Sequence, residues 1–375
     1  SRNIKTLPHH DNLKSFGACF GVSGGYERPM WFALDGEKAE YEYSYNYQSW
    51  YPSAEYETNN TVKNVGLFDL TPFSKFEIKS DKAHQELQKI CTANIKNEPG
   101  KCVYTHMLNP DGGIETDLTV VCIDKNHFRI ISSAATRERD KFHINKHLSK
   151  NVELKDITDD LCVFGLFGPK SRDLLKTLSE DNFENDQFKF GFAKFITIDG
   201  VKIWTQRLSY VGELGYELYV DLKDAKKIYE LLIEKGKDFN LSNCGMHAMD
   251  IMRMESGFLH WGHDISPEEN QYQAGLAFTI SNKKDVDFIG KQALEKIKQD
   301  KVKTRFSMFT LKESEPGKPL LLHDEPIYDG EKIIGRSTSG NYSFNFKKNL
   351  VFGYINNDFS NEELQNKNLF IEVEK

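Results

Sequence analysis

Residues 112–132 read GGIETDLTVVCIDKNHFRIIS, and this stretch decides the fold class. Two β-rich runs, 117–123 and 128–132, flank the polar residues 124–127, and this pattern predicts a β-hairpin. Upstream, the alternation of polar and apolar residues in 75–78 predicts a further half-buried strand. Strands joined by hairpins pair antiparallel, so we expect antiparallel sheets to carry the fold.

The sequence also predicts helices that pack on these strands. In 81–95 the apolar residues recur at three- and four-residue spacing, as on one face of an amphipathic helix. A proline at a first-turn position predicts a second helix near residue 169. Further strands are expected at 193–199, 201–209 and 216–220, and further helices at 223–235, 241–257 and 285–298. Such a mixture of strand pairs and helices indicates an α+β protein with largely antiparallel sheets and flanking helices.

The length of the chain predicts more than one domain, because single cores stop growing at about 250 to 300 residues and this chain has 375. Residues 1–45 contain several glycines and no sustained period, so we expect an irregular connector there. Residues 46–298 should form the main domain. The last part, 299–375, should be a small β-barrel, because glycines separate its short expected strands at 305–311, 332–338 and 350–355.

The composition narrows the class of protein and of partner. Hydrophobic residues make up 39% and charged residues 28%, a profile that favours a globular chain over a membrane-spanning or disordered one. The net charge of −7 disfavours nucleic acid and anionic lipid as partners. The six cysteines form no CxxC pair, so we expect free thiols in a reducing compartment, the cytoplasm or, in a eukaryote, the mitochondrial matrix.

Several strings, in order along the chain, resemble the C-terminal folate-binding region of dimethylglycine and sarcosine dehydrogenases, which is similar to the aminomethyltransferase (T protein) of glycine cleavage. They are DLTPFSKF (69–76), YTHMLN (104–109) with GGIETDLTV (112–120), FGPK (167–170), RLSYVGELGYE (207–217), RMESG (253–257), AGLAF (274–278) with FIGK (288–291), and EPIY (325–328) with TSG (338–340). Together they cover most of the chain.

The opening residues point to the dehydrogenase branch of this family. The strings GACFG (17–21) and GYERPMWF (25–32) resemble the stretch that joins the flavin half of these dehydrogenases to the folate half, and T proteins do not carry it. The chain also begins with Ser1 rather than methionine. We therefore expect a fragment, or a free-standing relative, of the dehydrogenase branch.

The resemblance implies an aminomethyltransferase-like fold and tetrahydrofolate as cofactor. The implied reaction captures an iminium or formaldehyde unit, released by oxidative demethylation of an N-methyl amino acid such as dimethylglycine or sarcosine, to form 5,10-methylene-tetrahydrofolate. FAD would belong only to an upstream domain outside this chain. The implied partners are folate, a small one-carbon donor, and a covalently linked or separate flavin dehydrogenase domain.

Five residues are candidates for the site on the strength of the resemblance. Asp117 corresponds to the catalytic aspartate, which would orient the folate amines and relay a proton. Glu217 corresponds to the carboxylate that accepts two hydrogen bonds from the pterin. Tyr104 and Tyr210 are expected to line the pocket, and Arg253 of the RMESG string to bind the cofactor. The competing structural roles are a turn-capping aspartate, an exposed strand glutamate and tyrosines that fill a core.

Some positions depart from the family pattern or from established site motifs. Met249 stands where T proteins have an arginine that helps to hold the pterin, and Ser133 stands where they have an asparagine. The stretch 260–264, HWGHD, lacks the third ligand of known zinc motifs, so we expect a structured loop and no metal. Residues 17–25 follow no strand and open no βαβ unit, so this chain itself should not bind FAD or NAD.

Two alternatives remain open at this point. The chain could be a T protein-like aminomethyltransferase that receives its substrate from a lipoyl carrier protein, which would need no flavin partner. It could also be a folate-binding module without catalysis, in which case substitution of Asp117 would have no effect on a reaction. The presence of Asp117 favours an enzyme.

Overall fold

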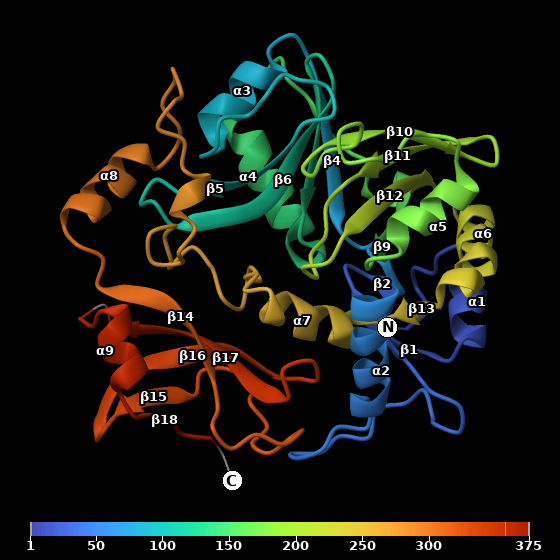
Figure 1. Ribbon diagram of the computed structural model, residues 1–375. Coiled ribbons are helices and arrows are strands. Elements are labelled where there is room, and N and C mark those ends of the chain that lie inside the picture. Colours follow the sequence, from blue (N-terminus) through green and yellow to red (C-terminus); the bar gives the residue numbers. More distant parts are fainter. Residues whose placement is uncertain (1, 357, 374–375) are drawn as a thin grey trace.

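The computed structural model describes residues 2–356 and 358–373. Within them, three large sheets surround the central helix α7 (Met246–Glu255), as Figure 1 shows. A fourth, two-stranded sheet belongs to the N-terminal segment. Short 3-10 turns complete the connections: η1 (Ala134–Thr136), η2 (Thr158–Asp160), η3 (Lys237–Phe239) and η4 (Ala277–Thr279).

The first sheet has six strands. In spatial order they are β10 (Ala193–Ile198), β11 (Val201–Gln206), β12 (Gly215–Asp221), β9 (Leu161–Phe167), β3 (Val65–Asp69) and β13 (Leu241–Cys244). All neighbours pair antiparallel except β13 and β3, which are parallel. Helices α5 (Ser171–Leu178) and α6 (Ala225–Gly236) cover one face, because leucines and isoleucines on both helices share a core with alternate residues of β12.

The second sheet has five antiparallel strands and its own helical cover. Its order is β5 (Cys102–Leu108), β6 (Ile114–Asp124), β7 (His127–Ser132), β4 (Ser74–Lys79) and β8 (Leu154–Asp156). Helices α3 (Ala83–Ile90) and α4 (Arg137–His147) cover one face, where Leu118 and Val120 of β6 join a core with Leu87 and Ile144. The predicted hairpin of 117–123 and 128–132 is thus β6 and β7.

The third sheet forms the C-terminal part. Its order is β14 (Thr304–Thr310), β17 (Lys348–Asn356), β16 (Lys332–Ser343), β15 (Pro326–Asp329) and β18 (Leu369–Ile371), with α9 (Asn361–Asn366) beside it and α8 (Lys291–Gln299) before it. The sheet is antiparallel throughout, consistent with a small barrel-like domain. The α+β class with largely antiparallel sheets is confirmed, whereas the predicted domain boundaries at residues 45 and 298 stay predictions.

The faces of the first two sheets that carry no helices meet in a shared apolar cluster. Val121 of β6 belongs to this cluster together with Trp204 of β11 and Tyr219 of β12. Because side chains alternate along a strand, every second residue of β6 and of β12 points into the space between the sheets. We call this space the intersheet region.

The expectation of irregular structure at 1–45 is wrong, whereas the role of this stretch as a connector stays a prediction. The segment forms α1 (His10–Ser15), the paired strands β1 (Ala18–Ser23) and β2 (Tyr26–Phe32), and a path into α2 (Tyr51–Lys63). A bulge at residues 19–20 interrupts the two-residue alternation, and strands this short give little periodic signal. Elements from the N-terminal segment lie against the rest of the chain in Figure 1.

Buried polar contacts fix this segment to the main body. His9 and Asp69 are both buried, and Nε2 of His9 lies 2.9 Å from Oδ2 of Asp69. The carboxylate of Glu57 on α2 accepts a hydrogen bond from the amide of Phe32 and another from the amide of Gly245, each at 2.8 Å. Burial raises the pKa of Glu57 to about 8. The connector is therefore an integral part of the fold.

The helix predicted over 241–257 is present but begins later than expected. Residues Leu241–Cys244 form the strand β13, and the helix α7 begins only after Gly245. A buried strand and a buried helix both read as apolar runs, so the sequence pattern could not separate them. Gly245 marks the change, because a Cβ at this position would lie 2.2 Å from the backbone of Met30. The helix predicted at 81–95 is shorter than expected and spans Ala83–Ile90.

A buried ion pair joins α7 to the third sheet. Nη1 of Arg253 donates to Oδ2 of Asp264 at 2.6 Å, and both side chains are almost fully buried. Oδ1 of Asp264 accepts the hydroxyls of Thr338 at 2.6 Å and Ser339 at 2.7 Å. The amide of His260 donates to the same carboxylate at 2.9 Å. Asp264 therefore organises the loop 260–264 and locks it to the C-terminal sheet.

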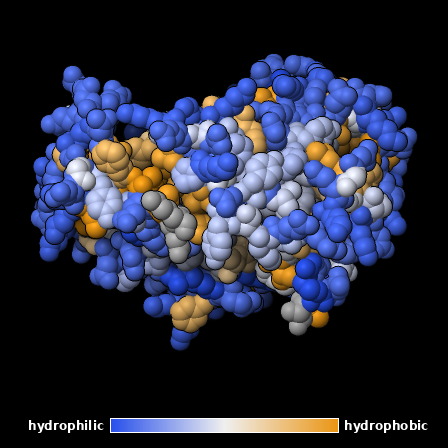
Figure 2. Space-filling view, turned by 90° about the horizontal axis from the view of Figure 1, so that it is seen from below, coloured by the Kyte–Doolittle hydropathy of each residue, from blue (hydrophilic) through white to orange (hydrophobic). Residues whose placement is uncertain are grey.

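The surface gives no sign of a membrane-spanning element. No helix among residues 2–356 and 358–373 is long and apolar enough to cross a bilayer. Seen from below, the apolar side chains form separate patches between hydrophilic ones (Figure 2). Scattered apolar groups of this kind are normal on a protein surface and do not mark a docking site.

We predict that Asp264→Ala lowers the free energy of unfolding by about 3–5 kcal/mol, because it leaves the buried guanidinium of Arg253 without its partner. Urea denaturation followed by circular dichroism measures this. The control is Asp287→Ala, which removes an exposed pair with Lys291 and should cost at most about 1 kcal/mol. Equal losses in the two variants would contradict a central role for Asp264.

Candidate functional site

Asp117 lies on β6 and points into the intersheet region, on the same face of the strand as Val121. Its side chain is 18% exposed, so it borders solvent. Its Oδ1 atom is buried and has no hydrogen-bond partner in the described part of the chain. Burial raises the pKa of Asp117 from 3.8 to about 7; the hydroxyl of Tyr104 counteracts the rise and the charge of Asp140 adds to it. The group can therefore both take up and release a proton near neutral pH.

His106 is the cross-strand neighbour of Asp117. Its Nε2 atom lies 3.6 Å from Oδ1 of Asp117 and 3.2 Å from the hydroxyl of Tyr104, while Nδ1 lies 3.1 Å from Thr279 and from Gln271. Burial lowers the pKa of His106 to about 3, so the imidazole is neutral at physiological pH. The contact with Asp117 is therefore not an ion pair and does not neutralise the carboxylate.

A second carboxylate, Asp140 on α4, lies behind β6. It is buried and accepts hydrogen bonds from the hydroxyls of Thr116 at 3.2 Å, Ser132 at 2.6 Å and Thr136 at 2.6 Å. Burial raises the pKa of Asp140 to about 6. No motif singled out this residue, because its link to Asp117 depends on how α4 packs against the sheet.

Glu217 lies on β12 and points into the intersheet region, like Tyr219 two residues further. The hydroxyl of Tyr219 donates to Oε2 of Glu217 at 2.9 Å. Burial raises the pKa of Glu217 to about 7. Gln206 pairs with Glu217 in the register of β11 and β12, so the two side chains are neighbours on one face. The described residues show no hydrogen bond between Glu217 and Asp117, which lie on facing sheets.

The two predicted tyrosines lie near Asp117. Burial raises the pKa of both Tyr104 and Tyr210, and the charge of Asp117 adds to the rise in each, which shows that the three side chains share one neighbourhood. Tyr104 keeps 38% of its surface exposed. The hydroxyl of Tyr210 donates to the carbonyl of Leu259 at 2.7 Å, and its ring stacks on Phe258. Tyr104 thus has surface free for a ligand, whereas Tyr210 is held in place by its neighbours.

Arg253 has protein partners for most of its donors. Besides Asp264, its guanidinium donates to Asp250 at 2.8 Å, to the carbonyl of Phe258 at 3.1 Å and to Ser339 at 3.0 Å, and the residue is 2% exposed. This arrangement favours a structural role, in which Arg253 holds the loop that orients Tyr210. Direct binding of a cofactor by Arg253 stays a prediction.

Four buried polar atoms of the intersheet region have no hydrogen-bond partner among the described residues. They are Oδ1 of Asp117, Nη1 of Arg129, Nε1 of Trp204 and Nε2 of Gln206. Cζ of Arg129 on β7 lies 5.5 Å from the ring centre of Tyr219, so Arg129 bridges the two sheets. The side-chain oxygen of Gln206, Oε1, accepts a hydrogen bond from the thiol of Cys102. Buried polar atoms are nearly always paired, so one acceptor and three donors left over in one region indicate a polar ligand.

Cross-strand register was the signal that could have identified these additional residues. Gln206 and Trp204 alternate on the strand that pairs with Glu217, and Arg129 faces them from the second sheet. Given the pairing of β11 with β12, the alternation rule would have placed Gln206 beside Glu217 and Trp204 beside Tyr219 on the same face. The sequence alone did not provide that pairing.

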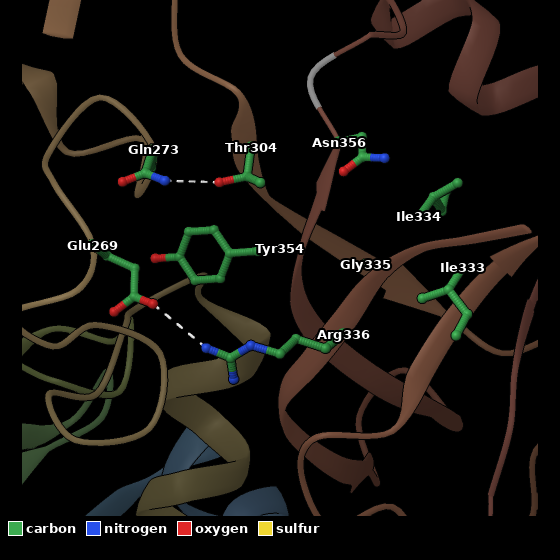
Figure 3. Close-up of a pocket in the computed structure, with 9 residues that line it drawn as sticks. All are labelled: Glu269, Gln273, Thr304, Ile333, Ile334, Gly335, Arg336, Tyr354 and Asn356. Carbon is green, nitrogen blue, oxygen red and sulfur yellow. Dashed lines mark hydrogen bonds and ion pairs between the residues drawn. The ribbon is translucent and has the colours of Figure 1, made fainter.

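The structure also has a cavity of about 410 Å³ elsewhere, between the loop around residue 270 and the third sheet (Figure 3). None of the predicted site residues lines it. Its polar groups pair with one another: Arg336 lies 3.5 Å from Glu269, Gln273 donates to Thr304 at 2.8 Å, and the hydroxyl of Tyr354 donates to a backbone carbonyl. This cavity therefore offers a ligand fewer free polar groups than the intersheet region does.

The described residues contain no group of three or more histidine, cysteine, aspartate or glutamate side chains that could hold a metal ion. The loop 260–264 instead owes its shape to Asp264, whose two carboxylate oxygens accept four hydrogen bonds.

Comparison with family models gives two matches along the chain. Residues 9–284 match the GCVT N-terminal domain, and residues 305–374 match the glycine cleavage T-protein C-terminal barrel domain. In fold, the chain is similar to aminomethyltransferase T of the glycine cleavage system from Bartonella henselae, with a TM-score of 0.79 over 94% of this chain and 90% of that one. Their sequence identity is 20%, so this likeness concerns the fold alone.

Three curated relatives show the range of similar proteins. The chain is 36% identical to 4-methylaminobutanoate oxidase (formaldehyde-forming) of Paenarthrobacter nicotinovorans over 91% of this chain and 41% of that protein. It is 33% identical to mitochondrial dimethylglycine dehydrogenase of Rattus norvegicus over 89% of this chain and 39% of that protein. It is 32% identical to an aminomethyltransferase of Halothermothrix orenii over 80% of this chain and 83% of that protein. The chain thus spans about two fifths of the length of the first two relatives.

We predict that Asp117→Asn stabilises the fold at pH 8 by up to a few kcal/mol and leaves stability unchanged near pH 3. A raised pKa means that the folded state holds a proton that the unfolded state has released between about pH 4 and 7, so stability falls as pH rises through this window. A difference of one pKa unit between the folded and the unfolded state changes the free energy of unfolding by about 1.4 kcal/mol. Urea denaturation at both pH values measures the effect, with Asp124→Asn, at the exposed end of β6, as control.

Proposed function

The chain belongs to the glycine cleavage T-protein family, and on that premise we propose that it binds tetrahydrofolate in the intersheet region and transfers a one-carbon unit onto it. It is an aminomethyltransferase-type enzyme domain related to dimethylglycine and sarcosine dehydrogenases. The observation that carries the proposal is the set of unpartnered buried polar atoms beside Asp117 and Glu217.

The chemistry of these atoms fits a pterin ring. Its amino-pyrimidine edge has neighbouring N–H donors, which the carboxylate of Glu217 would accept in a bidentate manner. Its carbonyl oxygen and ring nitrogens are acceptors for the free donors of Gln206, Trp204 and Arg129. The pKa of Glu217 near 7 reflects burial without a cation partner, and ligand N–H groups would lower it by stabilising the charged form.

Asp117 is suited to the proton step of a one-carbon transfer. Bound tetrahydrofolate supplies the N5 and N10 amines on which the one-carbon unit is carried. Asp117 would orient these amines, accept the proton that an attacking amine loses, and return it to the leaving group. Its pKa of about 7 matches that of an acid–base group working near neutral pH. Neutral His106 and buried Asp140 leave its carboxylate free of a neutralising cation.

We further propose that the one-carbon unit is an iminium or formaldehyde from oxidative demethylation of an N-methyl amino acid, captured as 5,10-methylene-tetrahydrofolate. The names of two relatives, a formaldehyde-forming oxidase and a dimethylglycine dehydrogenase, support this donor. A flavin dehydrogenase domain, linked or separate, would supply the unit. The similarity to an aminomethyltransferase supports the T-protein reaction as the alternative. An in-frame flavin domain in the gene would favour the dehydrogenase-linked reaction over this alternative.

Asp117→Asn should leave the affinity for tetrahydrofolate within a few-fold and abolish formation of 5,10-methylene-tetrahydrofolate, because the amide keeps the shape and loses the proton-accepting group. Single-turnover assays with formaldehyde, corrected for the uncatalysed condensation, measure the transfer. Asp124→Asn should retain full activity. Unchanged transfer in Asp117→Asn would favour a folate-binding module without catalysis.

Glu217→Ala should weaken the binding of tetrahydrofolate by roughly tenfold to a hundredfold, because charge-assisted hydrogen bonds are worth about 1.5–3 kcal/mol. Anaerobic calorimetric titration measures the affinity. Asp221→Ala, at the exposed end of the same strand, is the matched control and should bind like the unmodified chain. Equal affinity in all three proteins would exclude Glu217 as the pterin ligand.

A further inference from the structure

Arg28 on β2 carries a guanidinium that the protein itself does not neutralise. Its Nε atom is buried and has no hydrogen-bond partner within residues 2–356 and 358–373. Among the described residues, its Nη1 atom donates to the hydroxyl of Ser23 alone, at a long 3.4 Å. Burial lowers the pKa of Arg28 to about 10, although the group remains charged at neutral pH. Arg28 is thus a half-buried cation whose buried Nε atom has no partner among the described residues.

The charge of Asp69 favours the cationic form of Arg28, but this carboxylate is already engaged. Its Oδ2 atom lies 2.9 Å from Nε2 of buried His9, and its Oδ1 atom accepts the amide of Thr71 at 3.0 Å. No ion pair of Arg28 is found among the described residues. A buried N–H donor of a charged group is nearly always paired, so the free Nε atom of half-buried Arg28 points to a binding role.

The position of Arg28 relates it to the intersheet region. Its Cζ atom lies 5.9 Å from the ring centre of Phe73, and Phe73 packs, partly exposed, on the apolar cluster between the two sheets. The guanidinium therefore stands at the border of the region that holds the unpartnered atoms.

The hairpin that carries Arg28 also approaches the strand next to Asp117. At its tip, a Cβ on Gly24 would lie 3.3 Å from the carbonyl of Ala134. Ser132 pairs with Leu118 in the register of β7 and β6. Because the strands are antiparallel, the residue after Ser132 lies beside Asp117, and Ala134 follows it directly. The β1–β2 hairpin thus borders the catalytic aspartate's side of the site.

We propose that Arg28 binds a carboxylate of the ligand, namely the glutamyl end of tetrahydrofolate. The inference rests on the proposed function, because it assumes that a folate occupies the intersheet region. A guanidinium pairs with a carboxylate through two parallel N–H···O bonds, and the Nε atom left free here is one of the donors such a pair uses. An N-methyl amino acid also carries a carboxylate, so the test includes it as a separate ligand.

The test compares three ligands on the unmodified 375-residue chain and on Arg28→Met. Anaerobic calorimetry gives the affinities for tetrahydrofolate, for 6-methyltetrahydropterin, which lacks the glutamate, and for sarcosine. We expect Arg28→Met to weaken tetrahydrofolate binding on the order of tenfold or more and to leave 6-methyltetrahydropterin and sarcosine unaffected. Arg28→Lys, which keeps the charge, should restore part of the loss. Arg2→Met, on an exposed arginine of the same segment paired with Glu27, is the control.

The outcomes separate this inference from the function on which it rests. If the unmodified chain binds tetrahydrofolate and Arg28→Met binds it equally well, the inference is wrong and the function stands. If the unmodified chain binds neither folate nor pterin, the proposed function fails. If Arg28→Met loses affinity for both tetrahydrofolate and 6-methyltetrahydropterin, or for sarcosine alone, the assignment to the glutamyl end is also wrong. Arg28→Met should unfold at about the same temperature as the unmodified chain, because the half-buried guanidinium has only one long hydrogen bond to lose among the described residues; a clearly lower temperature would indicate a structural role instead.

Discussion

The desolvation of carboxylates on two facing sheets is the constraint on which the site depends. Asp117 and Glu217 are held between layers of aromatic and aliphatic side chains, and neither has a cation partner among the described residues. Each is therefore poised between its charged and neutral forms near pH 7. The surrounding fold must offset this cost, and it does so by covering the outer face of each sheet with helices that bury apolar surface.

Interlocking contacts hold the parts around this region in place. Asp264 and Arg253 join α7 to the third sheet, and Glu57 joins α2 to β2 and to the start of α7. All of these side chains are buried, so their hydrogen bonds are protected from water and sensitive to geometry. Helix α7 consequently works as a hub: a shift of this helix would move the loop that orients Tyr210.

How much the sequence could predict depended on the range of the contacts. Strands such as 193–199 were predicted because their alternation is local, and Asp117 and Glu217 became candidates because they lie within recognisable strings. The start of the helix predicted at 241–257 was wrong because residues 241–244 form β13, which pairs in parallel with β3 in the interior of the fold. Asp140 and Gln206 were missed because packing of α4 and strand register bring them to the site, and neither is encoded in a short motif.

Unpaired polar groups distinguish the intersheet region from the cavity near Tyr354. In the cavity near Tyr354, charged and amide groups satisfy one another, as a surface does when it has no ligand to receive. Between the sheets, Gln206, Trp204 and Arg129 keep free donors, and Arg28 adds an unneutralised charge at the border. Nη1 of Arg129 stays free although Nε and Nη2 of the same guanidinium donate to Glu77, so the contacts of the folded chain do not use every donor here. A ligand rich in acceptors and negative charge would use all of these groups at once, and the folate that we propose has this chemistry.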